Sequence, residues 1–301
     1  MTEPLGIPLE VAGKVLRFTK PETVLFPTGE TKGDLLRYLT ELAPVLLRHL
    51  ADRPITLVRY PSGISEKGFY QKNRPAHAPA WVDSVVLDGT RYLLARTAAD
   101  LALYAQWAAI EIHAPLCRVK RGELAFPDEL VIDLDPMPPA GWAEVVRAAR
   151  GVRHLLETAG LQGYPKTSGA TGLHVYLPIP PARPSREREA LVKRIGRLLE
   201  WALPDLYTTI WQVRRRHGVY VDYGQNAPGH TMAVPYTVRS VPGAQVSTPI
   251  RWEELDSVHP SDFTLHTVPE RVRRLGDLFA PVLGPPESTA RLEELARTSS
   301  P

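Results

Sequence analysis

The chain has 301 residues, 44% of them apolar and 23% charged, and its 36 basic against 33 acidic residues give a formal net charge of +3. This composition excludes a disordered tail or a fibrous protein, and the length suits one large domain or two closely packed ones with a substantial core. The chain has no uninterrupted apolar run of about 18 residues, which argues against a membrane span. Cys117 is its only cysteine, so an intramolecular disulfide and a cysteine-based zinc site are excluded.

The first ten residues contain no hydrophobic block of the kind that a signal peptide has, so the expected compartment is the cytoplasm. Prolines number 30, and most basic residues are arginines. Both features are typical of a GC-rich genome or a thermophilic host. Recognition of phosphate by arginine forks is the functional alternative, and it requires local clustering of arginines.

The N-terminal part of the chain alternates helical and strand-like patterns. Leucine spacing predicts one helix over residues 32–50, and β-rich runs predict strands at 55–60 and 91–95. Thr97 and Asp100 resemble a capping box, which predicts a helix that continues to about Ile112.

The rest of the chain continues this mixture. The predicted elements are a buried strand at 130–134, a helix at 142–159 ended by Gly160, a strand at 172–178, a helix at 185–203 with Ser185 as N-cap, a strand at 219–223 with a hairpin partner at 231–235, and a C-terminal helix at 288–297. This mixture of helices and strands predicts an α/β (α+β) fold. Polar residues at the strand ends predict an active cleft between two parts. We expect a single domain over 1–301, with a smaller part at about 1–100, a catalytic part at about 101–285 and a C-terminal helix and tail at 286–301.

Two carboxylates follow a hydrophobic run at residues 130–136, which read Leu-Val-Ile-Asp-Leu-Asp-Pro. Asp133 and Asp135 are two residues apart on a strand and therefore point to the same face. Like charges this close repel unless a cation lies between them, and Mg²⁺ or Mn²⁺ is the hard ion that prefers oxygen ligands. An exposed strand end with solvated acids is an equal alternative for this pair on its own.

A glycine-rich segment at residues 166–175 reads Lys-Thr-Ser-Gly-Ala-Thr-Gly-Leu-His-Val. Small residues let backbone amides approach an anion, and Lys166, Ser168 and His174 add hydrogen-bond donors. The segment does not match a Walker loop. Taken alone, it fits an ordinary glycine hairpin with a buried His174 better than an anion site.

A third carboxylate, Asp222, lies on another strand that looks buried, and arginines 214–216 and His217 precede it. A solvated turn is the plain interpretation of the arginines. The alternative is a cationic rim, joined by Arg239, that suits a polyphosphate. Two metal ions held by three carboxylates and facing such a pocket would suit phosphoryl or nucleotidyl transfer.

Together these motifs resemble the polymerase domain of bacterial ligase D, in the archaeo-eukaryotic primase superfamily, over nearly the full length. The segments that carry the resemblance are 24–27 with Thr31 and Lys32, 59–64, 68–73, 111–113, 130–136, 166–178, 219–226 and 233–239. The resemblance implies a primase-like fold with two mixed or antiparallel sheets, flanked by helices, around a central active-site cleft.

The resemblance also implies a role for each matching residue on the nucleotide side. The three aspartates, Asp133, Asp135 and Asp222, would be the catalytic metal ligands for Mn²⁺ or Mg²⁺. The residues that would bind the NTP or dNTP substrate are Ser168, His174, Lys166, Arg215, Arg239 and, near the sugar, His113. Family members typically prefer ribonucleotides and often manganese.

On the DNA side, the resemblance implies that Phe69 and Tyr70 stack on the template strand, as aromatic side chains do on single-stranded bases. Core packing is the alternative for this pair. Lys32, helped by Lys20, would hold the downstream 5′-phosphate of a gap, and Lys72 would also contact DNA.

Three positions depart from the family pattern. Relatives usually carry a lysine at the positions of Thr23 and Thr171, and often at that of Gly218. These changes concern 5′-phosphate and substrate preference more than the metal chemistry. Lys20, Arg216 and His217 are candidates to compensate.

The expected function is template-dependent nucleotide addition to primers or short gaps in DNA, during end joining or excision repair. The expected partners are gapped, primer–template or broken DNA, together with a separately encoded ligase and a Ku-like protein. We expect a stand-alone polymerase, because 301 residues leave no room for a ligase domain. We also expect a monomer without a membrane partner. A catalytically weak end-binding or bridging module is the alternative. A transferase for small molecules is disfavoured, because such a substrate needs no template platform.

Overall fold

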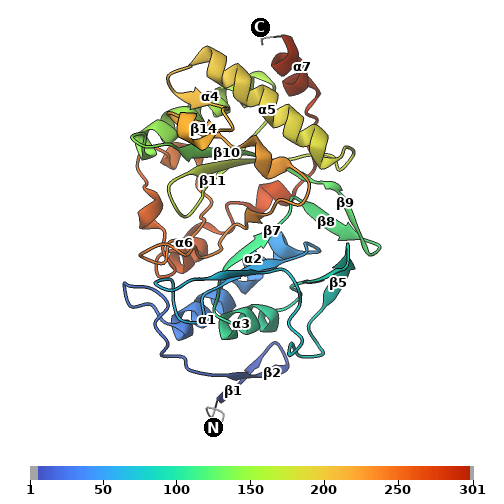
Figure 1. The fold of residues 1–301 in the computed structure, drawn as a ribbon, viewed down its shortest axis with the longest axis vertical. Helices are drawn as coiled ribbons and strands as arrows, with labels where there is room; N and C mark the ends of the chain where they lie inside the picture. The colour runs from blue at the N-terminus through green and yellow to red at the C-terminus, as the bar shows by residue number, and fades with distance from the viewer. Residues whose placement is uncertain (1–5, 299–301) are drawn as a thin grey trace. The chain divides into compact units, whose positions relative to one another are not determined.

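The computed structural model describes residues 6–298, and the chain divides into two compact units made of interleaved segments (Figure 1). The first unit comprises Met1–Leu124, Ala233–Thr248 and Ser261–Asp277, and the second comprises Ala125–Met232, Pro249–Pro260 and Leu278–Pro301. Neither unit is one continuous stretch of the chain. Residues 1–5 of the segment examined for a signal peptide, and residues 299–301 of the predicted tail, lie outside the described residues.

A four-stranded sheet with the order β15-β7-β3-β4 forms the centre of the first unit. Its strands are β3 (Thr56–Arg59), β4 (Phe69–Gln71), β7 (Ala109–Ala114) and β15 (Met232–Ala233). Strand β3 pairs antiparallel with both β4 and β7, so that Tyr70 lies opposite Val58 and His113 lies opposite Thr56. Every residue of β7 is buried, as expected for an internal strand.

Three helices supply the apolar core of the first unit: α1 (Lys32–Glu41), α2 (Ala43–Leu50) and α3 (Ala98–Gln106). Capping boxes start α1 at Thr31 and α3 at Thr97, and the second of these confirms the prediction from Thr97 and Asp100. Five of the leucines whose spacing predicted a helix here are buried: Leu35, Leu39, Leu42, Leu46 and Leu50.

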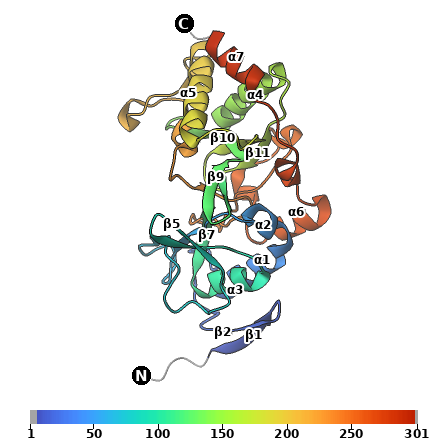
Figure 2. The same ribbon diagram turned by 90° about the vertical axis from the view of Figure 1, so that its right-hand side faces the viewer.

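Three β-hairpins use the same turn chemistry. They are β1 (Ile7–Val11) with β2 (Lys14–Phe18), β5 (Ser84–Leu87) with β6 (Thr90–Leu93), and β8 (Cys117–Lys120) with β9 (Glu123–Pro127). Each has two turn residues with positive φ, and the second is glycine: 12–13, 88–89 and 121–122. This is the turn whose twist matches the flanking strands. The first hairpin packs against α3, as Figure 2 shows.

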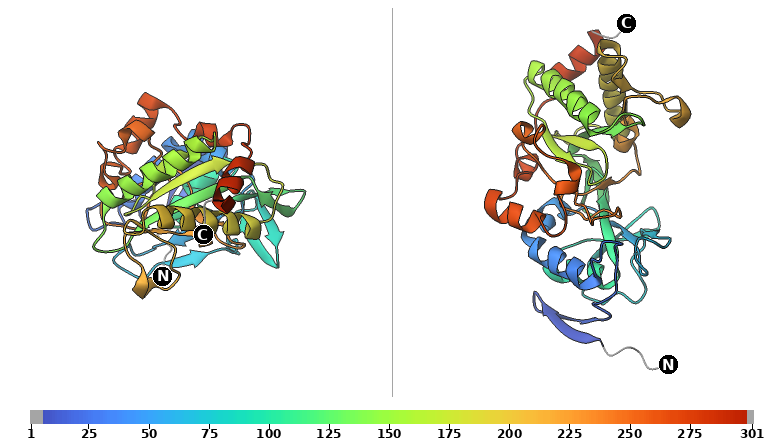
Figure 3. Two further views of the ribbon diagram at one scale, coloured as in Figure 1. Left: turned by 90° about the horizontal axis from the view of Figure 1, so that it is seen from above. Right: turned by 90° about the vertical axis from the view of Figure 1, so that its left-hand side faces the viewer.

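The second unit contains a five-stranded sheet with the order β11-β12-β10-β14-β13. Its strands are β10 (Glu129–Pro136), β11 (Tyr164–Thr167), β12 (Leu173–Pro178), β13 (Tyr207–Thr208) and β14 (Val219–Val221). All pairs are antiparallel except β13 with β14. Helices α4 (Trp142–Thr158) and α5 (Ser185–Ala202) lie on one face of this sheet (Figures 1 and 3).

The remaining elements complete the described chain. They are α6 (Val268–Leu275), α7 (Ala290–Thr298) and the 3-10 turns η1 (Val213–Arg215), η2 (Tyr223–Asn226), η3 (Trp252–Glu254), η4 (Pro260–Asp262) and η5 (Ala280–Leu283). Among residues 6–298, no helix combines the length and the apolar character that crossing a membrane requires. The predicted α/β (α+β) class, with mixed and antiparallel sheets flanked by helices, is confirmed.

Two predicted helix lengths were wrong. The helix predicted over 32–50 is two helices, because the chain turns at Leu42 and Pro44, which lacks an N–H, occupies the first turn of α2. The helix predicted to reach Ile112 ends at Gln106, and the chain enters β7 through Ala108, whose φ is +51°. The continuous burial of residues 99–105 and 109–114 is compatible with either structure, so periodicity alone did not locate the change.

Two further expectations need correction. Ser185 is the first residue of α5 rather than its N-cap; Pro184 is the N-cap and forms no side-chain capping bond. The strand predicted at 231–235 does not pair with β14. It is β15, and it joins the other sheet next to β7.

Candidate metal and nucleotide site

Three carboxylates meet at the end of the five-stranded sheet. Asp133 and Asp135 lie on β10, opposite His174 of β12 and Tyr220 of β14 respectively. Asp222 follows β14 directly, and its N–H donates to the carbonyl oxygen of Asp133 over 2.9 Å. One oxygen from each of the three carboxylates lies within 4.8 Å of the others. The structure thus brings together the three predicted metal ligands.

The donor set of this cluster fits a hard divalent cation. All three groups offer carboxylate oxygens, which Mg²⁺ and Mn²⁺ prefer over nitrogen or sulfur. Asp222 is already held in place, because its carboxylate accepts hydrogen bonds from the N–H of Gly224 at 3.1 Å and from Nε2 of Gln225 at 2.9 Å. Three anionic groups fixed this close repel one another, and a cation between them removes that repulsion.

The glycine-rich segment passes directly beside this cluster. A Cβ at Gly172 would lie 2.6 Å from the carbonyl oxygen of Leu134 and 2.9 Å from Oδ1 of Asp135, so only glycine fits there. Ser168 closes the turn, since its hydroxyl oxygen accepts from the N–H groups of Ala170 and Gly172. The segment is therefore a tight turn packed against a carboxylate, and not only an ordinary hairpin.

A buried lysine and a histidine connect this segment to Asp133. Nζ of Lys166, a residue with no exposed surface, lies 2.9 Å from Nδ1 of His174. Nε2 of His174 lies 3.4 Å from Oδ1 of Asp133. An ammonium group can only donate, so Nδ1 accepts and the ring proton lies on Nε2, facing the carboxylate. The structure thus places Lys166 and His174 beside the three aspartates.

The arginine-rich turn lies farther along the same unit. Arg215 is exposed in η1, where it donates to the side chain of Gln212 over 3.0 Å, and the structure does not bring it into the contacts of the three aspartates. The guanidinium of Arg216 lies 3.4 Å from the ring centre of Tyr220. Burial, followed by the charge of Asp222, raises the pKa of Tyr220, while Arg216 opposes this shift.

The backbone explains one departure from the family pattern. Gly218 has a φ of +56°, and a Cβ there would lie 2.4 Å from the carbonyl oxygen of Leu206. A lysine at this position is therefore strained whatever its side chain does. The N–H of Met137 donates to the carbonyl oxygen of Gly218, which ties this turn to the end of β10.

Two further predicted residues meet in the first unit. Nε2 of His113 lies 2.7 Å from Oε2 of Glu111, and Nε of Arg239 lies 3.1 Å from the same oxygen. Glu111 is 5% exposed. Its burial acts to raise the pKa of its carboxyl, but the hydrogen bond from His113, the charge of Arg239 and the bond from Ser240 lower that pKa to about 2. Glu111 was not predicted as a site residue.

The predicted template platform is exposed. Phe69 and Tyr70 on β4 are 45% and 67% exposed, so core packing does not explain them. The guanidinium of Arg59 lies over the Phe69 ring at 5.2 Å, and Tyr70 meets the ring of His113 edge to face at 6.2 Å. Lys72 is also exposed, immediately after this strand.

Lys32 is buried rather than extended into solvent. Its Nζ donates to the carbonyl oxygen of Thr19 over 2.7 Å and to Gln106 over 3.0 Å. Burial lowers its pKa to about 8, with the charges of Lys20 and Arg59 adding to the effect and that of Glu22 opposing it. The structure therefore gives Lys32 a fixed position, while Lys20 is exposed.

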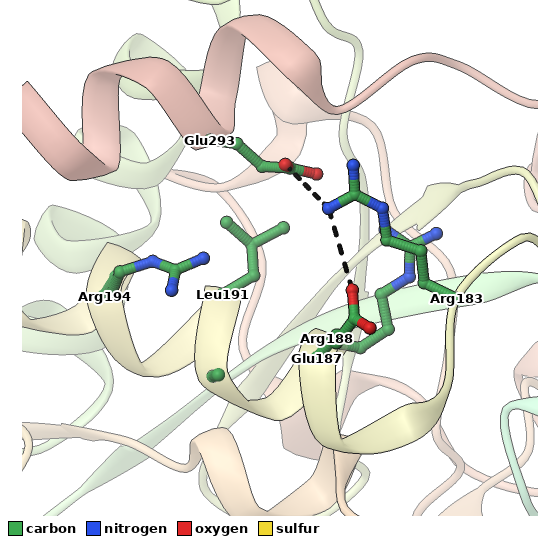
Figure 4. Close-up of a pocket in the computed structure, with 7 residues that line it drawn as sticks. Arg183, Glu187, Arg188, Leu191, Arg194 and Glu293 are labelled. Atoms are coloured by element: carbon green, nitrogen blue, oxygen red, sulfur yellow. Dashed lines mark hydrogen bonds and ion pairs between the residues drawn. The ribbon is translucent and has the colours of Figure 1, made fainter.

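A separate cavity of about 150 Å³ lies beside α5 and α7 in the second unit (Figure 4). Arg183 forms ion pairs there with Glu187 and Glu293. None of the predicted site residues lines this cavity; its lining residues are Arg183, Glu187, Arg188, Ala190, Leu191, Arg194 and Glu293. The aspartate cluster, and not this cavity, is therefore the candidate site.

Comparison with known proteins decides the family. The model of the family described as "LigD, primase-polymerase domain" matches residues 31–279. The chain belongs to the LigD primase-polymerase domain family. A solved LigD structure, the polymerase domain of Mycobacterium tuberculosis ligase D in complex with DNA, aligns with a TM-score of 0.82 at 36% identity. The alignment covers 89% of this chain and 97% of that chain.

Curated LigD proteins are similar over most of this chain. The multifunctional non-homologous end joining DNA repair protein LigD of M. tuberculosis (strain H37Rv) is 35% identical over 94% of the chain. The bifunctional non-homologous end joining protein LigD of Bacillus subtilis is 33% identical over 88% of it. The chain spans 40% and 43% of these two relatives, so it corresponds to less than half of each.

The sequence analysis did not find the residues that hydrogen-bond to the predicted site residues and fix their positions. Glu111 joins His113 to Arg239, Gln225 holds Asp222, and Gln106 holds Lys32. Glu111 and Gln225 lie inside the segments that carry the LigD resemblance, and the alternation of β7 places Glu111 on the same face as His113. No sequence pattern indicated a role for Gln106, because Lys32, the residue it bonds, is 74 residues away in sequence.

Proposed function

We propose that this chain is a template-dependent nucleotidyltransferase that extends DNA primers or fills short gaps, with a preference for ribonucleotides. The observation that carries the proposal is the cluster of Asp133, Asp135 and Asp222, whose oxygens lie within 4.8 Å. Its setting in a LigD primase-polymerase domain supports nucleotidyl transfer over other metal chemistry. The similar M. tuberculosis domain was solved in complex with DNA, which supports DNA as the partner.

In the proposed reaction, the 3′-hydroxyl oxygen of the primer attacks the α-phosphorus of the nucleotide and forms a new P–O bond. The bond from the α-phosphorus to the oxygen shared with the β-phosphate breaks, pyrophosphate leaves with that oxygen, and the hydroxyl proton passes to solvent. Asp133, Asp135 and Asp222 would hold Mg²⁺ or Mn²⁺, and the bound ions would supply Lewis acidity to the transfer. Lys166, Ser168 and His174 bind the phosphates beside that cluster. His174 points Nε2 toward the cluster because Lys166 occupies Nδ1. Fixed donors of this kind stabilise the charge that develops during in-line displacement.

Arg215, Arg239 and His113 complete the proposed nucleotide contacts, the first two at phosphates and the last near the sugar. An exposed Arg215 reaches a bound triphosphate by leaving Gln212. Its long, flexible side chain makes this movement inexpensive.

On the DNA side, Phe69 and Tyr70 stack on template bases, since both rings are exposed and a stacking platform tolerates every base. Lys20 and Lys72 attract the phosphate backbone, and Lys32 holds the 5′-phosphate at the far side of a gap. Binding therefore weakens as salt concentration rises.

We place this activity in the repair of broken DNA. The similar M. tuberculosis and B. subtilis proteins are named non-homologous end joining proteins, which supports that pathway over excision repair. A DNA ligase and a Ku-like end-binding protein are the proposed partners, and the cytoplasm is the proposed compartment of a monomeric polymerase.

Primer extension tests the proposal directly. A labelled primer faces a short gap that carries a 5′-phosphate, with Mn²⁺ or Mg²⁺ and with NTPs or dNTPs. Asp135→Asn keeps the size of the side chain and removes one ligand charge, so addition falls by about a thousandfold or more, equivalent to several kcal/mol. Asp88→Asn, in an exposed hairpin turn at a φ of +46°, is the matched control.

The alternative function gives a different result. An end-binding module binds the same gapped DNA tightly in wild type and in Asp135→Asn, yet neither adds a nucleotide. Template-directed addition that survives in a folded Asp135→Asn protein contradicts the proposed metal chemistry. Template-directed addition that is lost only in Asp135→Asn supports it.

A further inference from the structure

The buried carboxylate of Glu111 has no role in the proposed chemistry, yet it joins two residues that do. Glu111 lies in the middle of β7, two residues before His113, so both side chains are on one face of the strand. Its Oε2 accepts from Nε2 of His113 at 2.7 Å and from Nε of Arg239 at 3.1 Å. A single oxygen atom therefore sets the distance between the imidazole and the guanidinium.

The other oxygen of Glu111 is held by the backbone that carries Arg239. Oε1 accepts from the N–H of Ser240 at 2.8 Å and from the Ser240 hydroxyl. The hydroxyl of Tyr60 in turn donates to Ser240 Oγ over 3.1 Å. The carboxylate is thus fixed from two sides, and its orientation does not depend on a bound substrate.

The charge and proton positions follow from these contacts. The pKa of Glu111 is about 2, so the group is an anion at any working pH and accepts every one of these bonds. His113 must then carry a proton on Nε2, so in the neutral ring Nδ1 is the nitrogen without a proton. The Tyr70 ring and the imidazole meet in a T-shaped arrangement, with ring centres 6.2 Å apart.

We infer that Glu111 is a positioning residue that holds His113 and Arg239 in one arrangement for the incoming nucleotide and fixes the His113 tautomer. The inference rests on the proposed function for the roles of His113 and Arg239. It does not rest on it for the tautomer, which is a property of the protein without substrate. Glu111 itself does not touch the nucleotide.

The alternative is that Glu111 only ties β7 to the segment of Arg239 and Ser240. Two measurements separate the roles: steady-state kinetics of primer extension, and the ring ¹⁵N chemical shifts of His113. Glu111→Gln keeps the size but has one oxygen fewer, so it cannot accept from both pairs of donors. Glu123→Gln, an exposed residue of the same unit, is the matched control.

The inference predicts that Glu111→Gln raises the nucleotide KM by at least about tenfold, the effect of losing roughly one charge-assisted hydrogen bond. The affinity for gapped DNA stays within about twofold, because the phosphate contacts that dominate DNA binding are unchanged. The His113 ¹⁵N shifts change to those of a mixed tautomer, while Glu123→Gln matches wild type in every measurement. A folded Glu111→Gln protein with wild-type KM and wild-type His113 shifts overturns the inference.

A second variant covers the case in which Glu111→Gln does not fold because Arg239 loses its ion pair with Glu111. Glu111→Gln/Arg239→Gln removes both charges, and the His113 shifts are compared with those of Arg239→Gln alone. Identical His113 shifts in the two proteins overturn the inference, and a tautomer change only in the double variant supports it. If wild type adds no nucleotide, the proposed function fails, while the His113 shifts still decide the role of Glu111.

Discussion

Nζ of Lys166 lies 2.9 Å from Nδ1 of His174, and both residues are buried beside the three aspartates. The lysine sits on β11 and the histidine on β12, where the antiparallel register places them directly opposite each other. The next strand, β10, places Asp133 opposite His174. Three neighbouring strands therefore line up an ammonium, an imidazole and a carboxylate in one row across the sheet.

This row predicts the effect of removing the lysine charge. Lys166→Met keeps a long apolar side chain in the core but removes the donor that holds Nδ1 of His174. We expect nucleotide addition to fall by about 10- to 100-fold, the loss expected for one charge-assisted hydrogen bond. Single-turnover extension with saturating DNA measures it, and Lys120→Met, an exposed residue of β8, is the control. Unchanged addition by a folded Lys166→Met protein would show that His174 needs no such donor.

The low pKa of Lys32 predicts that recognition of the 5′-phosphate depends on pH. Below pH 8 the ammonium is charged, and above it the charge is lost, whereas an ordinary lysine stays charged to about pH 10.4. We expect the preference for 5′-phosphorylated over 5′-hydroxyl gapped DNA to shrink between pH 7 and pH 9 in titrations at constant salt. Lys32→Arg keeps its preference at pH 9, because arginine stays charged. An equal preference at both pH values in wild type would exclude Lys32 from this role.

The low pKa of Glu111 predicts how part of the free energy of unfolding changes as the pH falls. The pKa of this carboxyl is about 2 in the folded protein, against an ordinary value of 4.5 that applies in the unfolded chain. Its stabilising effect is therefore complete above pH 4.5 and disappears as the pH falls through 2. The pKa difference corresponds to about 3 kcal/mol. Urea unfolding at pH 7, 4 and 3 should show wild type losing more stability than Glu111→Gln over that range. Parallel acid profiles would contradict the assignment.

The environment of Tyr220 predicts that replacing it by phenylalanine does not lower the stability of the protein. The residue has no exposed surface, and within residues 6–298 its hydroxyl has no hydrogen-bond partner. Tyr220→Phe removes a buried, unsatisfied group, so the free energy of unfolding should stay constant or rise by up to about 1 kcal/mol, with primer extension retained. Tyr207→Phe is the contrast, because the Tyr207 hydroxyl donates to the carbonyl oxygen of Ala148 at 2.6 Å. That variant should lose about 1 kcal/mol, and equal urea midpoints for the two would refute the comparison.

The pairing of Asp133 with Asp135 was predictable because strand periodicity is local. Asp133 and Asp135 face one side by alternation alone, and the Gly172 turn follows from residues next to it in sequence. The partners of these residues were harder to find. His113 bonds to Glu111, and Lys32 bonds to Gln106. Both contacts depend on how separate strands and helices pack.

The predicted end of the helix that starts at Ala98 was wrong for a related reason. In α3 and β7 nearly every residue is buried, so neither a period of 3.6 nor a period of 2 marks where one ends and the other starts. The placement of β15 in the sheet of β7 is likewise set by packing. Nearness in sequence suggested β14 as its partner, and the chain instead crosses to the other unit.

The interleaving of the two units sets an order for their completion during synthesis. The first unit contains the N-terminal 124 residues, yet it also needs Ala233–Thr248 and Ser261–Asp277. The hydroxyl of Tyr38 donates to the carbonyl oxygen of Tyr236, and the hydroxyl of Tyr236 donates to Asp277. The segment of the first unit that precedes residue 125 therefore waits for residues 233–248 and 261–277, which are made later. A nascent chain stopped before residue 233 exposes the surface of α1 that these late segments cover.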